Sequence, residues 1–157
     1  MENAFNSTAP EGRSLLIQAV AERMYHGSLG EGEAERLFDF LSKAGKDPVD
    51  EVRVSAARGL QKATGEHFEP SYSRLAIPIL ITLIFDVRSE VRKAALEGLM
   101  LSTQESASAA SRMRELLRDS NADVRENAAW LLEKIDRIER RARTIDAQTA
   151  GTNGIER

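Results

Sequence analysis

The stretch Asp47-Pro48-Val49-Asp50-Glu51-Val52-Arg53 sets a pattern that this chain repeats twice more. The second copy is Asp86-Val87-Arg88-Ser89-Glu90-Val91-Arg92, and the third is Asp119-Ser120-Asn121-Ala122-Asp123-Val124-Arg125. Each copy has an Asp, three variable residues, an acid and then Val-Arg, and an Ala and a Leu follow the Val after four and eight residues. The copies lie 91 − 52 = 39 and 124 − 91 = 33 residues apart. A period of this size is typical of helical hairpins that stack into a solenoid.

Helical spacing of apolar residues, with Gly and Pro at the boundaries, predicts a series of helices around these stretches. They cover residues 10–26, 31–44, 49–64, 89–102, 106–118 and 122–143, with one more that opens at residue 70 or 71. This last helix has an Ile-rich middle that also fits a buried strand, since β-branched residues favour strands. Pro78 lies within it, however, and a proline would break the ladder of a central strand. We therefore expect a buried helix that bends at Pro78.

Length and composition indicate a single all-α domain. Of the 157 residues, 41% are hydrophobic and 30% are charged, while only 5% are aromatic, as in helices built from Ala, Leu, Glu and Arg. We expect a flexible N-terminus over residues 1–9, a repeat domain over 10–143 and a disordered tail over 144–157. The repeat domain has an extra N-terminal cap helix over 10–26 and three hairpins over about 30–65, 70–104 and 106–143.

Composition also argues against several kinds of function. The chain has no cysteine, which excludes disulfides and thiolate sites. Its net charge of −3 gives no general attraction for a phosphate backbone. Residues 1–5 do not open a secretory signal, and the apolar stretch over 75–85 is well short of the roughly 20 residues that cross a bilayer. We expect a cytoplasmic protein that does not enter a membrane.

The repeated signature resembles the HEAT repeat and the closely related HEAT-like repeats named after phycobilisome lyases, over about residues 30–137. In such repeats the signature opens the second helix of a hairpin, and the first helix often carries a proline kink, as Pro78 would provide. The resemblance implies a right-handed α-α superhelix of three hairpins. It also implies a structural ladder of ion pairs between adjacent repeats, in which Asp47, Asp86 and Asp119 pair with Arg53, Arg92 and Arg125.

The same Asp residues also suit a purely local role. An Asp at a hairpin turn can accept hydrogen bonds from free N–H groups of the helix that follows, and its charge complements the helix dipole. Both roles are structural, because three copies of one residue set do not indicate an active site.

The second helices of the hairpins offer a candidate binding surface. With about 100° of turn per residue, the positions two, six, nine and thirteen after the signature Val point away from the core, and in stacked hairpins they line the inner, concave surface. They form three rungs: Val54, Arg58, Gln61 and Gly65; Lys93, Glu97, Met100 and Gln104; Glu126, Trp130, Glu133 and Arg137. Mixed charges beside Trp and Met suit a protein or peptide partner. Trp130 is the expected anchor, unless it packs against the end of the stack.

The sequence offers no convincing catalytic or metal site. His26 and His67 are the only histidines, and neither is followed three or four residues later by a partner that would complete a metal-binding pair on one helix face. The glycines near residue 30 follow no strand, so they do not form a phosphate-binding loop. We expect no enzymatic activity and no cofactor.

We therefore predict a protein-binding module: an adaptor, a scaffold or an assembly factor. Three repeats are close to the minimum for a stable solenoid, so self-association or docking on a larger complex fits as well. The resemblance leaves open a lyase-like or chaperone subunit for tetrapyrrole attachment, although no residue supports it. The C-terminal arginines leave open nucleic-acid binding, although Asp136 and Glu139 dilute their charge; they are Arg137, Arg140, Arg141 and Arg143.

Overall fold

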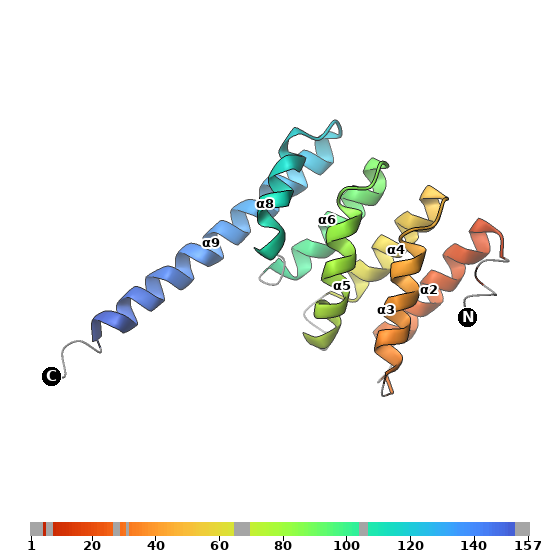
Figure 1. Ribbon diagram of the computed structural model, residues 1–157, viewed down its shortest axis with the longest axis horizontal. Helices are drawn as coiled ribbons and strands as arrows, with labels where there is room; N and C mark the ends of the chain where they lie inside the picture. The colour runs from red at the N-terminus through yellow and green to blue at the C-terminus, as the bar shows by residue number, and fades with distance from the viewer. Residues whose placement is uncertain are drawn as a thin grey trace.

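The computed structural model describes residue 5 and residues 8–26, 29–30, 32–64, 70–103 and 107–152, which form two layers of helices. The front layer in Figure 1 contains α3 (Glu33–Ala44), α5 (Pro70–Leu83) and a broken helix made of η1 (Ala107–Ala109), α8 (Ala110–Met113) and η2 (Arg114–Arg118). The second layer contains α2 (Pro10–His26), α4 (Asp50–Lys62), α6 (Ser89–Leu101) and α9 (Ala122–Thr152), each packed against the next. The layers alternate along the chain, so successive hairpins stack side by side.

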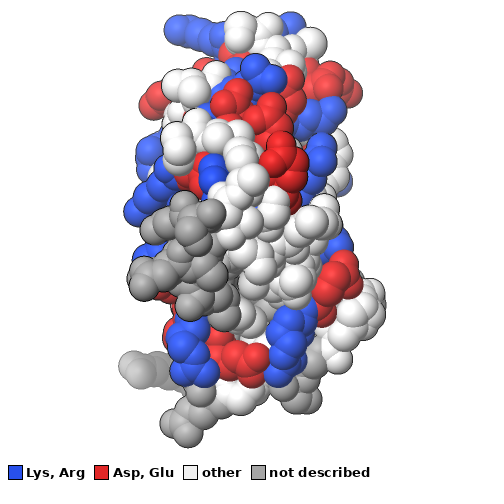
Figure 2. All heavy atoms as spheres, turned by 90° about the vertical axis from the view of Figure 1, so that its right-hand side faces the viewer, with Lys and Arg blue, Asp and Glu red and all other residues white. Residues whose placement is uncertain are grey.

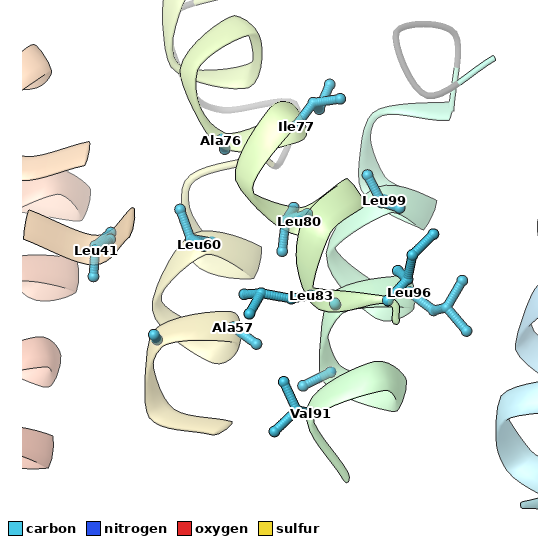
Figure 3. Packing of buried hydrophobic residues seen from close by; sticks show 14 of the residues in the cluster. Leu41, Ala57, Leu60, Ala76, Ile77, Leu80, Leu83, Val91, Leu96 and Leu99 are labelled. Carbon is cyan, nitrogen blue, oxygen red and sulfur yellow. The ribbon is translucent and has the colours of Figure 1, made fainter. Parts of the chain in front are cut away.

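The repeated Val, Ala and Leu of the signature form the buried side of the second layer. They are Val52, Ala56, Leu60, Val91, Ala95, Leu99, Val124, Ala128 and Leu132. In Figure 3, Leu80 of α5 lies between Leu60 of α4 and Leu99 of α6, so a first helix fills the space between two second helices. Gly98 permits this approach, because a Cβ atom at Gly98 would lie 2.9 Å from Cδ1 of Leu80.

The helix α5 continues through Pro78, so the Ile-rich stretch is helical, as the sequence predicts. A proline leaves the carbonyl four residues earlier, here that of Arg74, without its usual donor. Arg74 and Pro78 both lie on the exposed side of α5, where water can reach this carbonyl. The opposite side of the helix stays in the core through buried Ala76 and Leu80.

The predicted helix over 106–118 is wrong as a single α-helix. Within the described residues, a 3₁₀ turn (η1), one short α-helical turn (α8) and a second 3₁₀ helix (η2) take its place. The buried residues Ala110, Met113 and Leu116 recur every three residues. This is the period of a 3₁₀ helix, so the tighter winding keeps all three side chains on the core side.

The last helix, α9, extends to Thr152, so the expectation of a disordered tail from residue 144 is wrong as far as this residue. Residues 153–157 lie outside the described part. Side chains from Asp136 to Gln148 are exposed, so no core stabilises this segment. It contains four Arg and two Ala, which are strong helix formers, and at its start Arg137 forms an ion pair with Glu133, one turn earlier, at 2.8 Å.

The N-terminal helix α2 does more than cap the stack. It packs against α4 as α4 packs against α6, so it occupies the place of a second helix. Phe5 packs edge-on against Phe40 of α3, with ring centroids 5.0 Å apart. The described residues therefore form three complete hairpins preceded by the second helix of a fourth.

Candidate protein-binding surface

Ion pairs at the hairpin turns fix how the second helices are placed. Arg53 of α4 donates from Nε and Nη2 to the carboxylate of Asp86, at 2.7 and 3.0 Å. Arg92 of α6 donates in the same way to Asp119, at 2.7 and 2.6 Å. The remaining nitrogen, Nη1, donates to carbonyls in the arginine's own turn, as from Arg53 to the Asp47 oxygen at 2.9 Å. Each arginine thus ties its own turn to the carboxylate of the next hairpin.

A third ion pair begins in α2, where sequence reasoning did not expect one. Nη2 of Arg13 donates to Oδ1 of Asp47 at 2.8 Å, and Nε lies 2.8 Å from Oδ2. Nη1 donates to the Thr8 oxygen, as the other arginines do in their own turns. The sequence around Arg13 lacks the Asp and the Val of the signature, so the pattern did not include it. We define the ladder as Arg13–Asp47, Arg53–Asp86 and Arg92–Asp119.

Arg125, which the sequence led us to expect in the ladder, is not part of it. Its Nη1 donates to the carbonyl oxygens of Asp119 and Ser120, at 2.7 and 3.0 Å, so it is oriented like the arginines before it. The carboxylate of Asp119 is bound to Arg92 instead. Among the described residues, no carboxylate forms an ion pair with Arg125.

The ladder carboxylates also have a local role in their turns. Oδ1 of Asp47 accepts the backbone N–H of Val49 at 2.9 Å, and Asp86 and Asp119 accept the N–H two residues on at the same distance. Burial by itself raises the pKa of Asp86, but hydrogen bonds from Arg53 and from the backbone of Arg88 outweigh it and lower this pKa. Arg92 and a backbone N–H lower the pKa of Asp119 in the same way.

We define the second-helix face as the outward surface of α2, α4, α6 and α9. The described residues of the three expected rungs all reach this surface to some degree. Exposed are Arg58, Glu126, Trp130, Glu133 and Arg137, and partly buried are Val54, Gln61, Lys93, Glu97 and Met100. Gly65 and Gln104, which complete the expected rungs, lie outside the described residues.

Some charges on the second-helix face are neutralised within the molecule, and others are not. Nζ of Lys93 lies 2.6 Å from Oδ2 of Asp123, and this hydrogen bond raises the pKa of Lys93. Arg137 is paired with Glu133 on the same helix. Arg58, Glu97 and Glu126 form no ion pair with any residue that the structure describes. Within the expected rungs, these three charges are therefore available to a partner.

Trp130 is not part of the core at the end of the stack. Its side chain is 46% exposed, and Nζ of Lys134 lies 4.9 Å from the ring centroid. A half-exposed indole with a cation on one face keeps its edge and much of its surface in contact with solvent.

An open cleft at one edge of the second-helix face brings three successive second helices together. Its lining consists of Ser14 of α2, of Arg88 and Glu90 at the start of α6, and of five residues of α4: Asp50, Glu51, Val54, Ser55 and Arg58. Ser14 was missed in the sequence, because α2 carries no full signature. Arg13 was the only residue from which the sequence could have revealed it. When Arg13 is aligned with Arg53, Gln18 and Tyr25 take the positions of Arg58 and Gly65 and so also belong to this face.

The other candidate chemistry receives little support from the geometry. Among the described residues, no group of three His, Asp or Glu side chains is arranged to hold a metal ion. His26 lies 3.3 Å from Glu22 on its own helix, and His67 lies outside the described residues. Arg143 lies 3.8 Å from Glu139, which reduces the positive charge of the C-terminal arginines. No helix within the described ranges combines the length and the apolar character that a bilayer crossing needs.

Comparisons with known proteins agree with this architecture. A family model described as HEAT repeats matches residues 37–133, or 133 − 37 + 1 = 97 of the 157 residues. The chain is also similar to the crystal structure of an engineered protein, with 21% identity and a TM-score of 0.61, over 82% of this chain and 58% of that chain. This likeness shows the fold alone, and the chain spans less than two thirds of the engineered protein. A search of curated proteins found no match. With the signature repeated three times and the family model covering more than half of the sequence, the chain belongs to the HEAT-repeat family.

Proposed function

We propose that this protein is a non-catalytic binding module, an adaptor, scaffold or assembly factor, that holds a protein or peptide segment against the second-helix face. HEAT repeats commonly mediate protein–protein interaction. The observation that carries the proposal is a face on which Arg58, Glu97 and Glu126 lack ion pairs among the described residues while Trp130 is half exposed. Trp and Arg are enriched at the centres of binding surfaces, and polar residues surround them.

The charges on the face change sign along the stack. Among the rung charges that form no ion pair with a described residue, Arg58 on α4 is positive, whereas Glu97 on α6 and Glu126 on α9 are negative. A complementary segment therefore has an acidic residue over α4 and a basic residue over α9, with an apolar side chain between them that reaches Trp130. Adjacent helices lie roughly 10 Å apart, so crossing from α4 to α9 takes about 20 Å, which is about six extended residues.

The ladder favours binding because it holds the face in one arrangement before a partner arrives. The guanidinium groups of Arg53 and Arg92 are bound at all three nitrogens, and both side chains are only 11% exposed. A surface that is already ordered loses less conformational entropy on binding.

A random peptide library displayed on phage tests the proposal without knowledge of the natural partner. We expect selection on the immobilised protein to enrich peptides with an acidic residue about six positions from a basic one and an apolar residue between them. Trp130→Ala and Arg58→Glu should each weaken the selected peptides by at least about tenfold, which is about 1.4 kcal/mol.

The matched control is Arg74→Glu, which makes the same charge change at an exposed position of α5, on the other layer. Circular dichroism of each variant verifies folding. Peptides that bind Arg58→Glu and Trp130→Ala as tightly as the unmodified protein, but lose affinity for Arg74→Glu, would place the binding surface on the first-helix layer and refute the proposal.

A further inference from the structure

The side of α2 that points away from α4 is uncovered. In α4 and α6, the corresponding side is covered by the preceding second helix. With Arg13 aligned to Arg53 and Arg92, Leu15 and Ala19 take the positions of Ser55 and Gly59 in α4 and of Ala94 and Gly98 in α6. In α4 and α6 these positions face the preceding second helix. A Cβ atom at Gly59 would lie 3.3 Å from Cγ2 of Ile17, and one at Gly98 would lie 3.3 Å from Cα of Gln61.

In α2 the same positions face solvent. Leu15 is 64% exposed and Leu16 is 36% exposed, whereas Ala94 is 3% exposed. Figure 2 looks onto this end of the stack and shows an uncharged area bordered by charged side chains above and below it. Two neighbouring leucines and Ala19 on one helix face form an apolar patch with charged side chains around it, which is typical of an interaction surface.

We propose that this face binds a second copy of the chain, with the two α2 helices antiparallel across a two-fold axis. The helix is complementary to itself in that arrangement. When the axis passes at the level of residue 17, each residue faces the one on the partner whose number brings the sum to 34, as in 15 + 19 = 34 and 11 + 23 = 34. Leu15 then lies opposite the small Ala19 of the partner subunit. Glu11 lies opposite Arg23 of the partner subunit, which is also paired with Glu33 of its own chain at 2.9 Å. Size and charge therefore match on both sides of the axis.

The ladder argues against a further HEAT hairpin as the occupant. A preceding hairpin would need an Asp six residues before Arg13, as Asp47 precedes Arg53, but the sequence has Ser7 there. The other end of the stack does not fit the apolar patch either, since it exposes Arg125 and Glu133. A two-fold contact uses the same surface on both copies, so it closes as a dimer and does not build filaments.

The interface consists mainly of one pair of helices, which is small compared with stable dimers. We therefore expect a dissociation constant on the order of 10 μM. Sedimentation equilibrium of the full chain between about 1 and 500 μM measures it. Leu15→Asp places two charges in the interface, one from each copy, so we expect the dissociation constant to rise by at least about a hundredfold.

Leu117→Asp is the matched control, because Leu117 is 43% exposed on η2 and should leave dimerisation unchanged. Circular dichroism shows whether the variants fold. A monomer at every concentration of the unmodified chain, or a Leu15→Asp variant that dimerises as before, would overturn the proposal. The expected peptide contacts lie on α4, α6 and α9, whereas this patch lies at the free end of the stack on α2, so the selected peptides should bind Leu15→Asp normally whatever the outcome.

Two further measurements test the antiparallel arrangement. Glu11→Arg alone and Arg23→Glu alone each create like charges across the axis, so each variant should dimerise weakly, whereas their equimolar mixture should form a heterodimer with both pairs restored. The chain has no cysteine, so Leu15→Cys mixed with Ala19→Cys should form a disulfide faster than either variant alone. Faster self-linking of Leu15→Cys, or a mixture that associates no better than its components, would refute this geometry.

Discussion

Asp86→Ala removes the carboxylate that binds Arg53 and leaves a guanidinium in a mostly buried position without its counter-ion. Both side chains are 11% exposed, so the pair belongs with buried rather than surface ion pairs. Loss of one member of a buried pair costs about 3–5 kcal/mol. Because Nη1 of Arg53 keeps its bonds to the carbonyls of Asp47 and Pro48, we expect the lower end, about 3 kcal/mol.

Urea unfolding followed by circular dichroism at 222 nm measures this cost. With an m-value of roughly 2 kcal/mol/M, the midpoint should fall by about 1.5 M. The control is Asp39→Ala, since Asp39 is paired with Lys43 while 63% exposed, and exposed pairs contribute little. Equal midpoints for the two variants would refute the reasoning that the ladder stabilises the stack.

Asp86→Asn separates the ion pair from the turn. An Asn side chain still accepts the backbone N–H of Arg88 but carries no charge for Arg53. The free energy of unfolding of Asp86→Asn should therefore lie between those of the unmodified chain and of Asp86→Ala. In the double variant with Arg53→Ala, the combined cost should be smaller than the sum, because no unpaired charge is left.

Three further outcomes follow from the same contacts. The pKa values of Asp86 and Asp119 are lowered from 3.8, the usual value for Asp. The ionised carboxylates should therefore contribute fully to stability above pH 3.8, and this contribution should be lost as the pH falls below it; urea midpoints across pH 2–6 measure the loss. Gly98→Ala should destabilise by about 1 kcal/mol, because overpacking against Leu80 outweighs the better helix propensity of Ala. Arg125→Ala should cost far less than the corresponding change at an interior ladder arginine, since no described carboxylate depends on it; equal urea midpoints would contradict this.

The sequence predicts most of the fold because the signature combines apolar periodicity with turn residues. Val52, Ala56 and Leu60 identify both the helix and its buried side. The winding of residues 107–118 was not predictable, because the apolar residues also fit one face of an α-helix and only the three-residue spacing of the core contacts in the structure favours the 3₁₀ form. The length of α9 depends on local helix propensity where no buried side marks the end.

The fourth second helix was missed for a different reason. α2 retains the contact that Arg13 makes but not the Asp and Val by which the other copies are identified. A search for the full signature therefore finds only three second helices, whereas the ladder of ion pairs joins four. The same omission hid the contribution of Ser14 to the cleft and the exposed patch around Leu15.

The ladder and the proposed binding face are linked through adjacent positions in the sequence. Arg53 directly precedes Val54, and Arg92 directly precedes Lys93, so each ladder arginine is followed by the first residue of a rung. When the arginine binds the next turn with two parallel hydrogen bonds, it fixes the rotation of its helix about its own axis. The rungs of neighbouring helices then point in the same direction. The buried ion pairs thus give each repeat the orientation that a continuous surface needs. Hydrophobic contacts alone would fix this orientation less strictly, because they have no preferred direction.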